Sequence, residues 1–340
     1  MAEAPRSEIT IDRAALRSNL RRLREVLGGS ELWAVVKANA YGHGAATVAR
    51  TAIEEGAAAL CVATIEEGLE LRALEPEARI VVLGGAAASG ARAAREARLE
   101  LGVSAAPFPE GIPLHVKVDT GMGRWGFQGD FASTVDVVSL MSHFASADSD
   151  PAFTELQIAR FAAIAAAHPE LTRHLANSAG ILRFPASHLD AGRAGIAMYG
   201  ISPFGGDLAG DGLQPVLSWR SSIALVKRLA PGESTGYGRR FVATEPTWIG
   251  IVPVGYADGF RRGLTGTRVL VDGARRPVVG TISMDALAVE LAAPVEPGTP
   301  VTLIGDGLVI EEHAAHLGTI GYELACGIDS SSERATRKVL

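Results

Sequence analysis

The sequence predicts two domains, a parallel (β/α)8 barrel of the TIM type with some shortened crossovers and a C-terminal domain made mainly of β-strands. Short apolar runs alternate with helical segments as far as residue 198, which is typical of a parallel sheet with helical crossovers. The pattern then changes, and 340 residues exceed the usual size of one hydrophobic core. We therefore expect the barrel over residues 1–210 and the β domain over residues 211–340.

A helix is expected before the first barrel strand. Asp12 can cap it. Its leucines recur at helical spacing on one face: Leu16, Leu20, Leu23 and Leu27. Eight apolar runs then look like buried strands: 32–37, 59–64, 79–83, 101–103, 114–118, 137–144, 174–178 and 191–198. Eight strands with helical crossovers are the number that closes a (β/α)8 barrel.

The crossovers are unequal in length. Residues 151–167 predict a long helix, because Asp150 and Pro151 form a cap and first-turn pair. Its predicted apolar face carries Leu156, Ala159, Ala163 and Ala167. The connection 104–113 has only about ten residues, whereas a parallel crossover usually needs a dozen or more. We therefore expect trimmed outer helices near the fourth and fifth units of the barrel.

Beyond residue 205 the segments are strand-like and punctuated by turns, with almost no helical periodicity. The strand-like segments are SSIALVKRL, TWIGIVPV, TRVLVDG, RRPVVGTISM, ALAVEL and PVTLIG. This pattern predicts a separate β domain.

Composition narrows the classes of function. A hydrophobic content of 47% and a net charge of -6 describe a globular protein without a basic face, so nucleic acid is not expected as a partner. Neither a signal-peptide pattern nor a run of about 18 apolar residues is present, so we expect a cytoplasmic protein without membrane contact. Cys61 and Cys326 form no CxxC pair, which argues against a zinc ribbon or a disulfide framework. We expect two reduced, partly buried thiols and no metal.

The first barrel strand ends in a lysine within AVVKANAYGHG, residues 34–44. A desolvated lysine has a depressed pKa and can attack a carbonyl to form a Schiff base, as in some aldolases or in enzymes that hold pyridoxal phosphate (PLP). The alternative is a lysine whose ammonium group reaches solvent at the mouth of the barrel. Spacing alone does not decide between these two interpretations of Lys37.

Polar residues fall repeatedly at the carboxyl ends of the predicted strands, the functional face of such barrels. Besides Lys37 they are Tyr41, Lys117, Asp119, Arg124, His143, Asn177, Ser178 and Arg193. Ser178 in NSAG and the backbone of GIAMYG, residues 195–200, could bind a phosphate group, although small residues at strand ends usually form turns only. His143 could stack against a planar ligand or act as an acid or base, but a lone histidine in an apolar strand is more often a core residue. Arg124 could equally be a surface arginine. A buried Arg193 needs an acceptor such as a carboxylate or a ring nitrogen.

Four stretches of the β domain place polar or aromatic side chains beside glycines or turns: STGYGRRF, VGYADGF, SMDA and GYEL. The side chains are Tyr237, Tyr256, Met284, Asp285 and Tyr322. Each one alone is more simply explained as an ordinary hairpin residue.

Taken together, these stretches resemble the alanine racemases, PLP-dependent enzymes that pair an N-terminal barrel with a C-terminal β domain. The matching motifs keep the family's order along nearly the whole chain: AVVKANAYGHG, KVDTGMGRWGF, SHFASAD, HLANSAG, GRAGIAMYG, GYGRRF, GYADGF and SMD. An ordered set of this kind is far more specific than any single motif.

The resemblance implies the role of each residue. Lys37 would hold PLP and transfer a proton on one face of the substrate Cα, and Tyr237 of the neighbouring subunit would act on the other face, in a head-to-tail homodimer. Arg193 would meet the pyridine nitrogen. The phosphate ligands would be Tyr41, Ser178, Gly195, Ile196 and Tyr322, while His143 and Asn177 line the cofactor. The substrate carboxylate would meet Arg124 and the Met284 backbone, with Tyr256 and Asp285 at the entrance. Lys117 matches a lysine that is often carbamylated in the family.

The expected function is therefore interconversion of L- and D-alanine, which would supply D-alanine for peptidoglycan if the source is bacterial. Three alternatives are a racemase of serine or of several amino acids, a PLP-holding protein without turnover, and a decarboxylase, the last disfavoured by GYGRRF and SMD. Two departures from the family are visible. The chain is short around Lys117 and Arg124, and the tail GIDSSSERATRKVL lacks the expected proline-containing ending.

Overall fold

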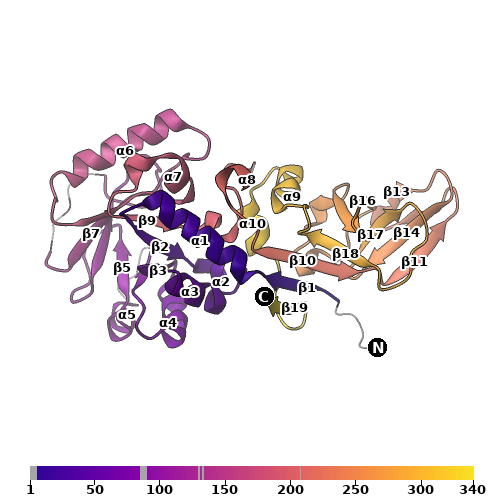
Figure 1. The fold of residues 1–340 in the computed structure, drawn as a ribbon, viewed down its shortest axis with the longest axis horizontal. Coiled ribbons are helices and arrows are strands. Elements are labelled where there is room, and N and C mark those ends of the chain that lie inside the picture. Colours follow the sequence, from indigo (N-terminus) through magenta and orange to yellow (C-terminus); the bar gives the residue numbers. More distant parts are fainter. Residues whose placement is uncertain (1–5, 85–89, 129–130, 132–133, 207) are drawn as a thin grey trace. The chain divides into compact units, whose positions relative to one another are not determined.

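The computed structural model describes residues 6–84, 90–128, 131, 134–206 and 208–340 (Figure 1). The chain divides into two compact units. The barrel unit comprises Ala15–Gln214, and the β unit comprises Met1–Ala14 together with Pro215–Leu340. The main division thus falls four residues after the expected one, and the first 14 residues join the β unit instead of the barrel.

The barrel unit contains a closed barrel of eight parallel strands in sequence order, which confirms the predicted fold. The strands are β2 (Glu31–Val35), β3 (Ala59–Val62), β4 (Ile80–Val82), β5 (Glu100–Val103), β6 (Leu114–Lys117), β7 (Val137–Met141), β8 (Thr172–His174) and β9 (Ala191–Ala194). Each overlaps or adjoins one predicted run. Several end earlier than predicted, so His143, Asn177 and Ser178 follow their strands instead of lying on them.

The helices of this unit surround the barrel (Figure 1). They are α1 (Arg13–Leu27), α3 (Ala45–Glu54), α4 (Ile65–Leu74), α5 (Ala91–Glu96), α6 (Pro151–Ala165), α7 (Ser178–Arg183) and α8 (Leu208–Asp211), together with the irregular turn α2 (Lys37–Tyr41). All four predicted leucines of α1 are buried. Residues 104–113 form no helix, and neither do the described residues between β6 and β7, which confirms the trimmed crossovers.

Helix α6 begins as expected, because the Asp150 side chain accepts a hydrogen bond from the Phe153 amide. Its predicted apolar face is wrong, since Leu156, Ala159, Ala163 and Ala167 are exposed. The buried residues are Thr154, Gln157, Phe161 and Ala165. Gln157 faces inward because its amide bonds the loops that follow β6 and β7, which a small alanine side chain cannot do, and the buried Thr154 hydroxyl donates to the Asp150 carbonyl.

The β unit is built on a nine-stranded sheet with the order β11-β14-β17-β16-β15-β18-β10-β1-β19. These strands are β1 (Glu8–Ile11), β10 (Leu217–Ser222), β11 (Leu225–Leu229), β14 (Thr247–Val252), β15 (Arg268–Val271), β16 (Ala274–Val279), β17 (Leu287–Leu291), β18 (Pro300–Ile304) and β19 (Thr336–Val339). A small hairpin pairs β12 (Ser234–Thr235) with β13 (Phe241–Val242). Two short helices, α9 (Ile310–Leu317) and α10 (Gly321–Cys326), were not predicted, because each has too few turns to show a periodicity.

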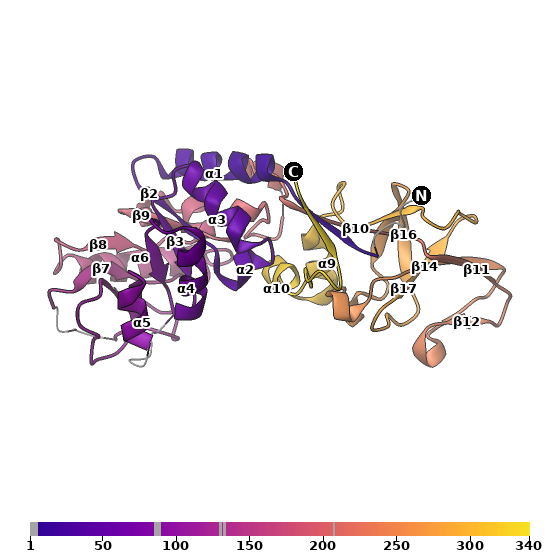
Figure 2. The ribbon, with the colours of Figure 1, turned by 90° about the horizontal axis from the view of Figure 1, so that it is seen from below.

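Strand β1 explains why the N-terminal residues belong to the β unit. It pairs antiparallel with β10 and parallel with β19, so the indigo strand and β10 run side by side (Figures 1 and 2). Within the described ranges, no helix has both the length and the apolar character needed to cross a membrane. Both cysteines are free, Cys61 being buried and Cys326 exposed.

Candidate active site

Lys37 is the first residue of a left-handed turn. Strand β2 ends at Val35, and the backbone from Ala38 to Tyr41 then takes φ values of 51° to 54° at four successive residues. For L-residues this conformation costs roughly 1–2 kcal/mol per residue, and runs of it are rare outside functional sites. Glycine would avoid this cost, yet residues 38–41 have the sequence ANAY and contain no glycine. The turn must therefore be held by contacts around it.

Glu67 supplies the principal contact. Its carboxylate accepts hydrogen bonds from the Ala38 amide at 2.7 Å and from the Ala63 amide at 2.7 Å. The same residue completes a capping box with Thr64 at the start of α4. A helix cap thus fixes the backbone next to Lys37. Glu67 was not predicted as a functional residue, although the capping-box pattern T-x-x-E is visible in the sequence.

Tyr41, Ser178 and Gly195 meet at one place. The Ser178 hydroxyl accepts hydrogen bonds from the Gly195 amide at 3.0 Å and from the Ala197 amide at 3.2 Å. A Cβ atom at Gly195 would lie 2.9 Å from the Tyr41 hydroxyl, so any other residue there would displace the tyrosine ring. Asn177 caps α7 through a 2.9 Å bond to the Gly180 amide, and Ile196 is fully buried. Hydroxyl and backbone N–H donors gathered in this way suit a phosphate group.

Arg193 lies on β9 and is 2% exposed. Its Nη1 donates to the His174 carbonyl at 2.7 Å and to His174 Nδ1 at 2.8 Å. Its Nη2 donates to the Ser142 and Leu175 carbonyls at 2.6 and 3.1 Å and lies 3.3 Å from His143 Nδ1. Burial lowers the pKa of the guanidinium to about 10, so it stays positively charged at neutral pH. None of the described bonds involves its Nε–H.

The cationic side chains at the carboxyl end of the barrel act on one another. Burial lowers the pKa of Lys117 to about 8, with further contributions from Arg193, Arg124 and Lys37. Burial holds the pKa of His143 well below its usual value, and the positive charges of Arg193, Arg124 and Lys37 lower it further. Several positive groups therefore converge on a place that could hold an anionic ligand. Lys117 also donates to the Leu83 carbonyl at 2.6 Å.

Arg124 projects from a closed loop after β6. The Asp119 carboxylate accepts from the amides of Gly121 and Met122 at 2.9 Å and of Gly123 at 3.1 Å. The Asp119 amide donates to the Phe127 carbonyl at 2.9 Å, which closes the base of the loop. Arg124 itself is exposed. The loop is thus ordered by its own backbone, although the chain is short here.

In the β unit, Tyr237 lies in a short 3-10 turn, Tyr237–Arg239, between β12 and β13. Its carbonyl accepts a 2.7 Å bond from the Thr281 hydroxyl. A Cβ atom at Gly236 would lie 2.8 Å from the Thr281 amide, so glycine is needed for this close approach. The Tyr237 turn is therefore joined to the segment that leads into SMDA.

Tyr256 and Met284 are held together by backbone contacts. The Tyr256 amide donates to the Ser283 carbonyl and the Ala257 amide to the Met284 carbonyl, both at 3.0 Å. A Cβ atom at Gly255 would lie 2.3 Å from the Ser283 oxygen, which excludes any other residue there. The β unit thus gathers the turns of Tyr237, Tyr256 and Met284.

Two arginines near the ends of the chain hold Asp285. Arg334 Nη1 lies 2.6 Å from Asp285 Oδ1, and its hydrogen bond lowers the pKa of that carboxyl. Arg6 Nη2 bonds the buried Asp258 at 2.9 Å and lies 3.5 Å from Asp285 Oδ1. The divergent C-terminal tail therefore supports the SMDA turn, a role that the sequence did not reveal.

The structure thus forms two groups of predicted residues, one in each unit. The barrel unit holds Lys37, Tyr41, Lys117, Arg124, His143, Asn177, Ser178, Arg193, Gly195 and Ile196, and the β unit holds Tyr237, Tyr256, Met284 and Asp285. Tyr322 lies on α10 of the β unit, and its contact with a phosphate group stays a prediction. In the described ranges, no group of three or more His, Cys, Asp or Glu side chains is placed to bind a metal ion.

Two family models match the chain. The model described as the N-terminal domain of alanine racemase matches residues 11–203, and the model of the C-terminal domain matches residues 216–336. Each model thus falls largely on one unit of the structure.

Individual relatives match along almost their whole length. Alanine racemase of Geobacillus stearothermophilus is 40% identical, over 94% of this chain and 90% of that protein. Alanine racemase of Streptomyces coelicolor is 40% identical, over 97% of this chain and 95% of that protein. The crystal structure of alanine racemase from E. faecalis has a TM-score of 0.91 at 36% identity, with 98% of both chains covered. That from Streptomyces coelicolor has a TM-score of 0.90 at 38% identity, with the same coverage of both chains.

Proposed function

Because the chain belongs to the alanine racemase family, we propose that it interconverts L- and D-alanine through two proton-transferring groups, Lys37 and Tyr237. The observation that carries this proposal is the match of both domains, at 40% identity over 94% of this chain. The chain is an amino-acid isomerase. Inversion at Cα requires that one group removes a proton and that another returns one from the opposite face.

The residues of the barrel unit fit PLP. Its phosphate would meet the hydroxyl and amide donors gathered around Tyr41, Ser178 and Gly195, with Ile196 beside them. His143 and Asn177 would line the ring. Arg193 would direct its Nε–H, which none of the described bonds uses, toward the pyridine nitrogen. Lys37 would hold PLP, which would supply an electron-withdrawing group that makes the Cα–H of a substrate joined to it acidic.

Arg193 limits how far negative charge spreads from Cα. A guanidinium donates hydrogen bonds and accepts none, and a pKa of about 10 keeps it protonated at neutral pH. It therefore disfavours a protonated pyridine nitrogen. Charge kept near Cα favours the return of a proton there, as racemisation requires.

Other residues orient the substrate. We propose that Arg124 binds the alanine carboxylate, together with the Met284 backbone of the partner subunit, and that Tyr256 and Asp285 line the entrance. Lys117 is proposed to carry a carbamate that orients Arg124. This modification requires a neutral amine, and the lowered pKa of about 8 makes a fraction of the Lys117 side chain neutral under mild conditions.

A homodimer follows from the same proposal. Tyr237 is 72% exposed and Met284 is 51% exposed, so both side chains are available to the surface of a partner subunit. A partner subunit would bury them and so complete each site. We further propose a cytoplasmic enzyme whose D-alanine serves peptidoglycan synthesis.

Incubation with L- or D-alanine in deuterium oxide tests the function. We expect both enantiomers to interconvert and deuterium to enter at Cα. Release of carbon dioxide would indicate a decarboxylase, and an unchanged substrate would indicate a cofactor-holding protein. Serine, offered in the same assay, measures how narrow the substrate preference is.

A further inference from the structure

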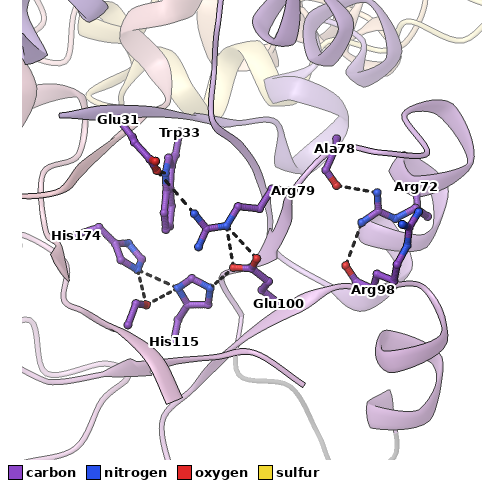
Figure 3. A network of polar contacts seen from close by, with 10 residues as sticks. Glu31, Trp33, Arg72, Ala78, Arg79, Arg98, Glu100, His115 and His174 are labelled. Carbon is purple, nitrogen blue, oxygen red and sulfur yellow. Dashed lines mark hydrogen bonds and ion pairs between the residues drawn. The ribbon is translucent and has the colours of Figure 1, made fainter. Parts of the chain in front are cut away.

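A row of buried polar side chains begins at His174, which Arg193 contacts, and Figure 3 shows its members His174, His115, Glu100 and Arg79. It links His174 on β8, Ser139 on β7, His115 on β6 and Glu100 on β5. His115, Ser139 and His174 are fully buried. Arg79 ends the row with hydrogen bonds to both Glu100 oxygens at 2.9 and 3.0 Å. The mechanism proposed above uses none of these five side chains.

The proton positions in this row follow from Arg193. Its Nη1 can only donate, so His174 Nδ1, 2.8 Å away, must accept and carries no proton. The single proton of a neutral His174 is then on Nε2. That atom lies 3.2 Å from Ser139 Oγ and 3.1 Å from His115 Nδ1. His174 therefore donates away from Arg193.

At the other end of the row, the hydrogen bonds are donated in the same direction. Glu100 is held by Arg79, and its Oε2 lies 2.8 Å from His115 Nε2, which therefore donates. A neutral His115 then accepts at Nδ1, where the Ser139 hydroxyl lies at hydrogen-bond distance and donates. Every bond from Arg193 to Glu100 thus points toward the carboxylate.

The charge states agree with this assignment. Burial lowers the pKa of His115 and holds that of His174 well below the ordinary value, so both rings are neutral at neutral pH. Burial opposes ionisation of Glu100, but hydrogen bonds from His115 and Arg79 prevail and lower its pKa to about 2. Trp33 is fully buried, and its ring centroid lies 4.4 Å from that of His174. Arg79 Cζ lies over the same ring, 4.7 Å from its centroid. The indole side chain shields the row from water.

We propose that Glu100, His115, Ser139 and His174 are positioning residues that hold Arg193 in the orientation needed for racemisation. The carboxylate fixes the direction of each hydrogen bond, and the last bond fixes the His174 tautomer that accepts from Arg193. Hydrogen bonds aligned in one direction polarise one another, so the negative charge of Glu100 strengthens the bond at Arg193. This inference rests on the proposed function, because it takes Arg193 as the contact of the pyridine nitrogen.

The first test measures the histidine tautomers directly. The holoenzyme is labelled with 15N-histidine. The ring nitrogens of His115 and His174 are then observed by NMR from about pH 6 to about pH 9, a range in which an ordinary histidine loses its charge. The signals are assigned with the variants H115Q and H174Q. We expect both rings to be neutral with the proton on Nε2 throughout. A proton on His174 Nδ1, or a charged His115, would overturn the proposal.

The second test removes the charge while keeping the shape. E100Q should lower kcat roughly tenfold and leave KM within about twofold, because remote couplings of this kind are modest and the row does not touch the substrate. S139A should have a smaller effect, since His174 Nε2 can still bond His115 Nδ1 directly. The matched control is E96Q, whose carboxylate forms an exposed pair with Arg92.

Equal kcat values in E100Q and E96Q would contradict the proposal. If the wild-type enzyme failed to racemise alanine, the proposed function would be wrong, whereas the tautomer pattern would still decide the arrangement of the row. If E100Q failed to fold, the NMR result on the wild-type protein alone would decide.

Discussion

The two units present their candidate residues in opposite ways. In the barrel unit, Ser178 and Arg193 are 3% and 2% exposed and are held by several hydrogen bonds each. In the β unit, Tyr237 and Met284 are 72% and 51% exposed, and only their backbones are held. One half of the proposed site is thus assembled within the unit. In the other half, the backbone of each turn is hydrogen-bonded and the side chains are exposed.

This difference separates folding from assembly. Buried polar groups with several partners contribute to stability, and their removal leaves unsatisfied acceptors. Exposed side chains on a fixed backbone contribute little to stability, so a change there affects function alone. Variants of buried residues should therefore lose stability, and variants of exposed residues should lose activity alone.

Lys37→Ala should have the largest effect on activity. Loss of both the cofactor attachment and one proton-transfer group should reduce kcat/KM by at least about a thousandfold. The measurements are racemisation in deuterium oxide and the visible absorption of bound PLP. Normal colour in the variant would refute the role of Lys37, and circular dichroism should show an unchanged fold.

Tyr237→Phe should reduce proton exchange by about a hundredfold, mainly for one enantiomer. The melting temperature should stay close to that of the wild type, because the side chain is 72% exposed. Exchange rates of L- and D-alanine measured separately check this expectation. Equal loss for both enantiomers would argue against two catalytic groups acting on opposite faces.

Arg193→Met should behave in the opposite way to Tyr237→Phe with respect to stability. The variant leaves the His174, Ser142 and Leu175 carbonyls without their donor, so the free energy of unfolding should fall by about 3 kcal/mol. Urea denaturation, with Tyr237→Phe as the control, measures this difference. A variant as stable as the wild type would show that the barrel group is less constrained than its hydrogen bonds indicate.

The stability of the barrel unit should rise with pH through Lys117. Its pKa is about 8 in the folded chain and 10.5 in the unfolded chain, so between these values the unfolded state binds more protons. The free energy of unfolding should therefore increase by roughly 2 kcal/mol from pH 8 to pH 10.5 in carbonate-free buffer. Lys117→Met should lack this part of the slope.

Met284→Leu should have the smallest effect. The proposed contact uses the backbone of Met284, and the Ala257 amide holds its carbonyl whichever side chain is present. We expect KM for alanine to change by less than about threefold, since swaps between these side chains cost little. A large rise in KM would indicate that the thioether itself contacts the substrate.

Much of the fold was predictable because the barrel strands are short apolar runs separated by helical segments. The first helix was also predicted, since Leu16 to Leu27 repeat at helical spacing. The inner face of α6 was not, because Gln157 is buried through hydrogen bonds to distant loops, while Thr154 bonds the Asp150 carbonyl at the start of its own helix. Polar side chains that face inward carry no apolar pattern.

The site was predictable in its residues but not in its supports. The ordered motifs identified Lys37, Arg193 and Tyr237. They did not indicate the left-handed turn after Lys37, because it contains no glycine, or the Glu67 bonds that hold it. The row from His174 to Glu100 joins residues on four strands, which become neighbours only when the barrel closes. Supports of this kind depend on tertiary structure.

The pairing of β1 with β10 and β19 imposes an order of events during synthesis. All eight barrel strands lie between Glu31 and Ala194, so they are synthesised before β10. Strand β1 emerges first, yet it has no partner until Leu217–Ser222 appears, and its second partner ends one residue before the end of this chain. Because domains generally fold as units during synthesis, the barrel can fold while β1 is still unpaired. The unit that presents Tyr237 is thus begun first and completed last.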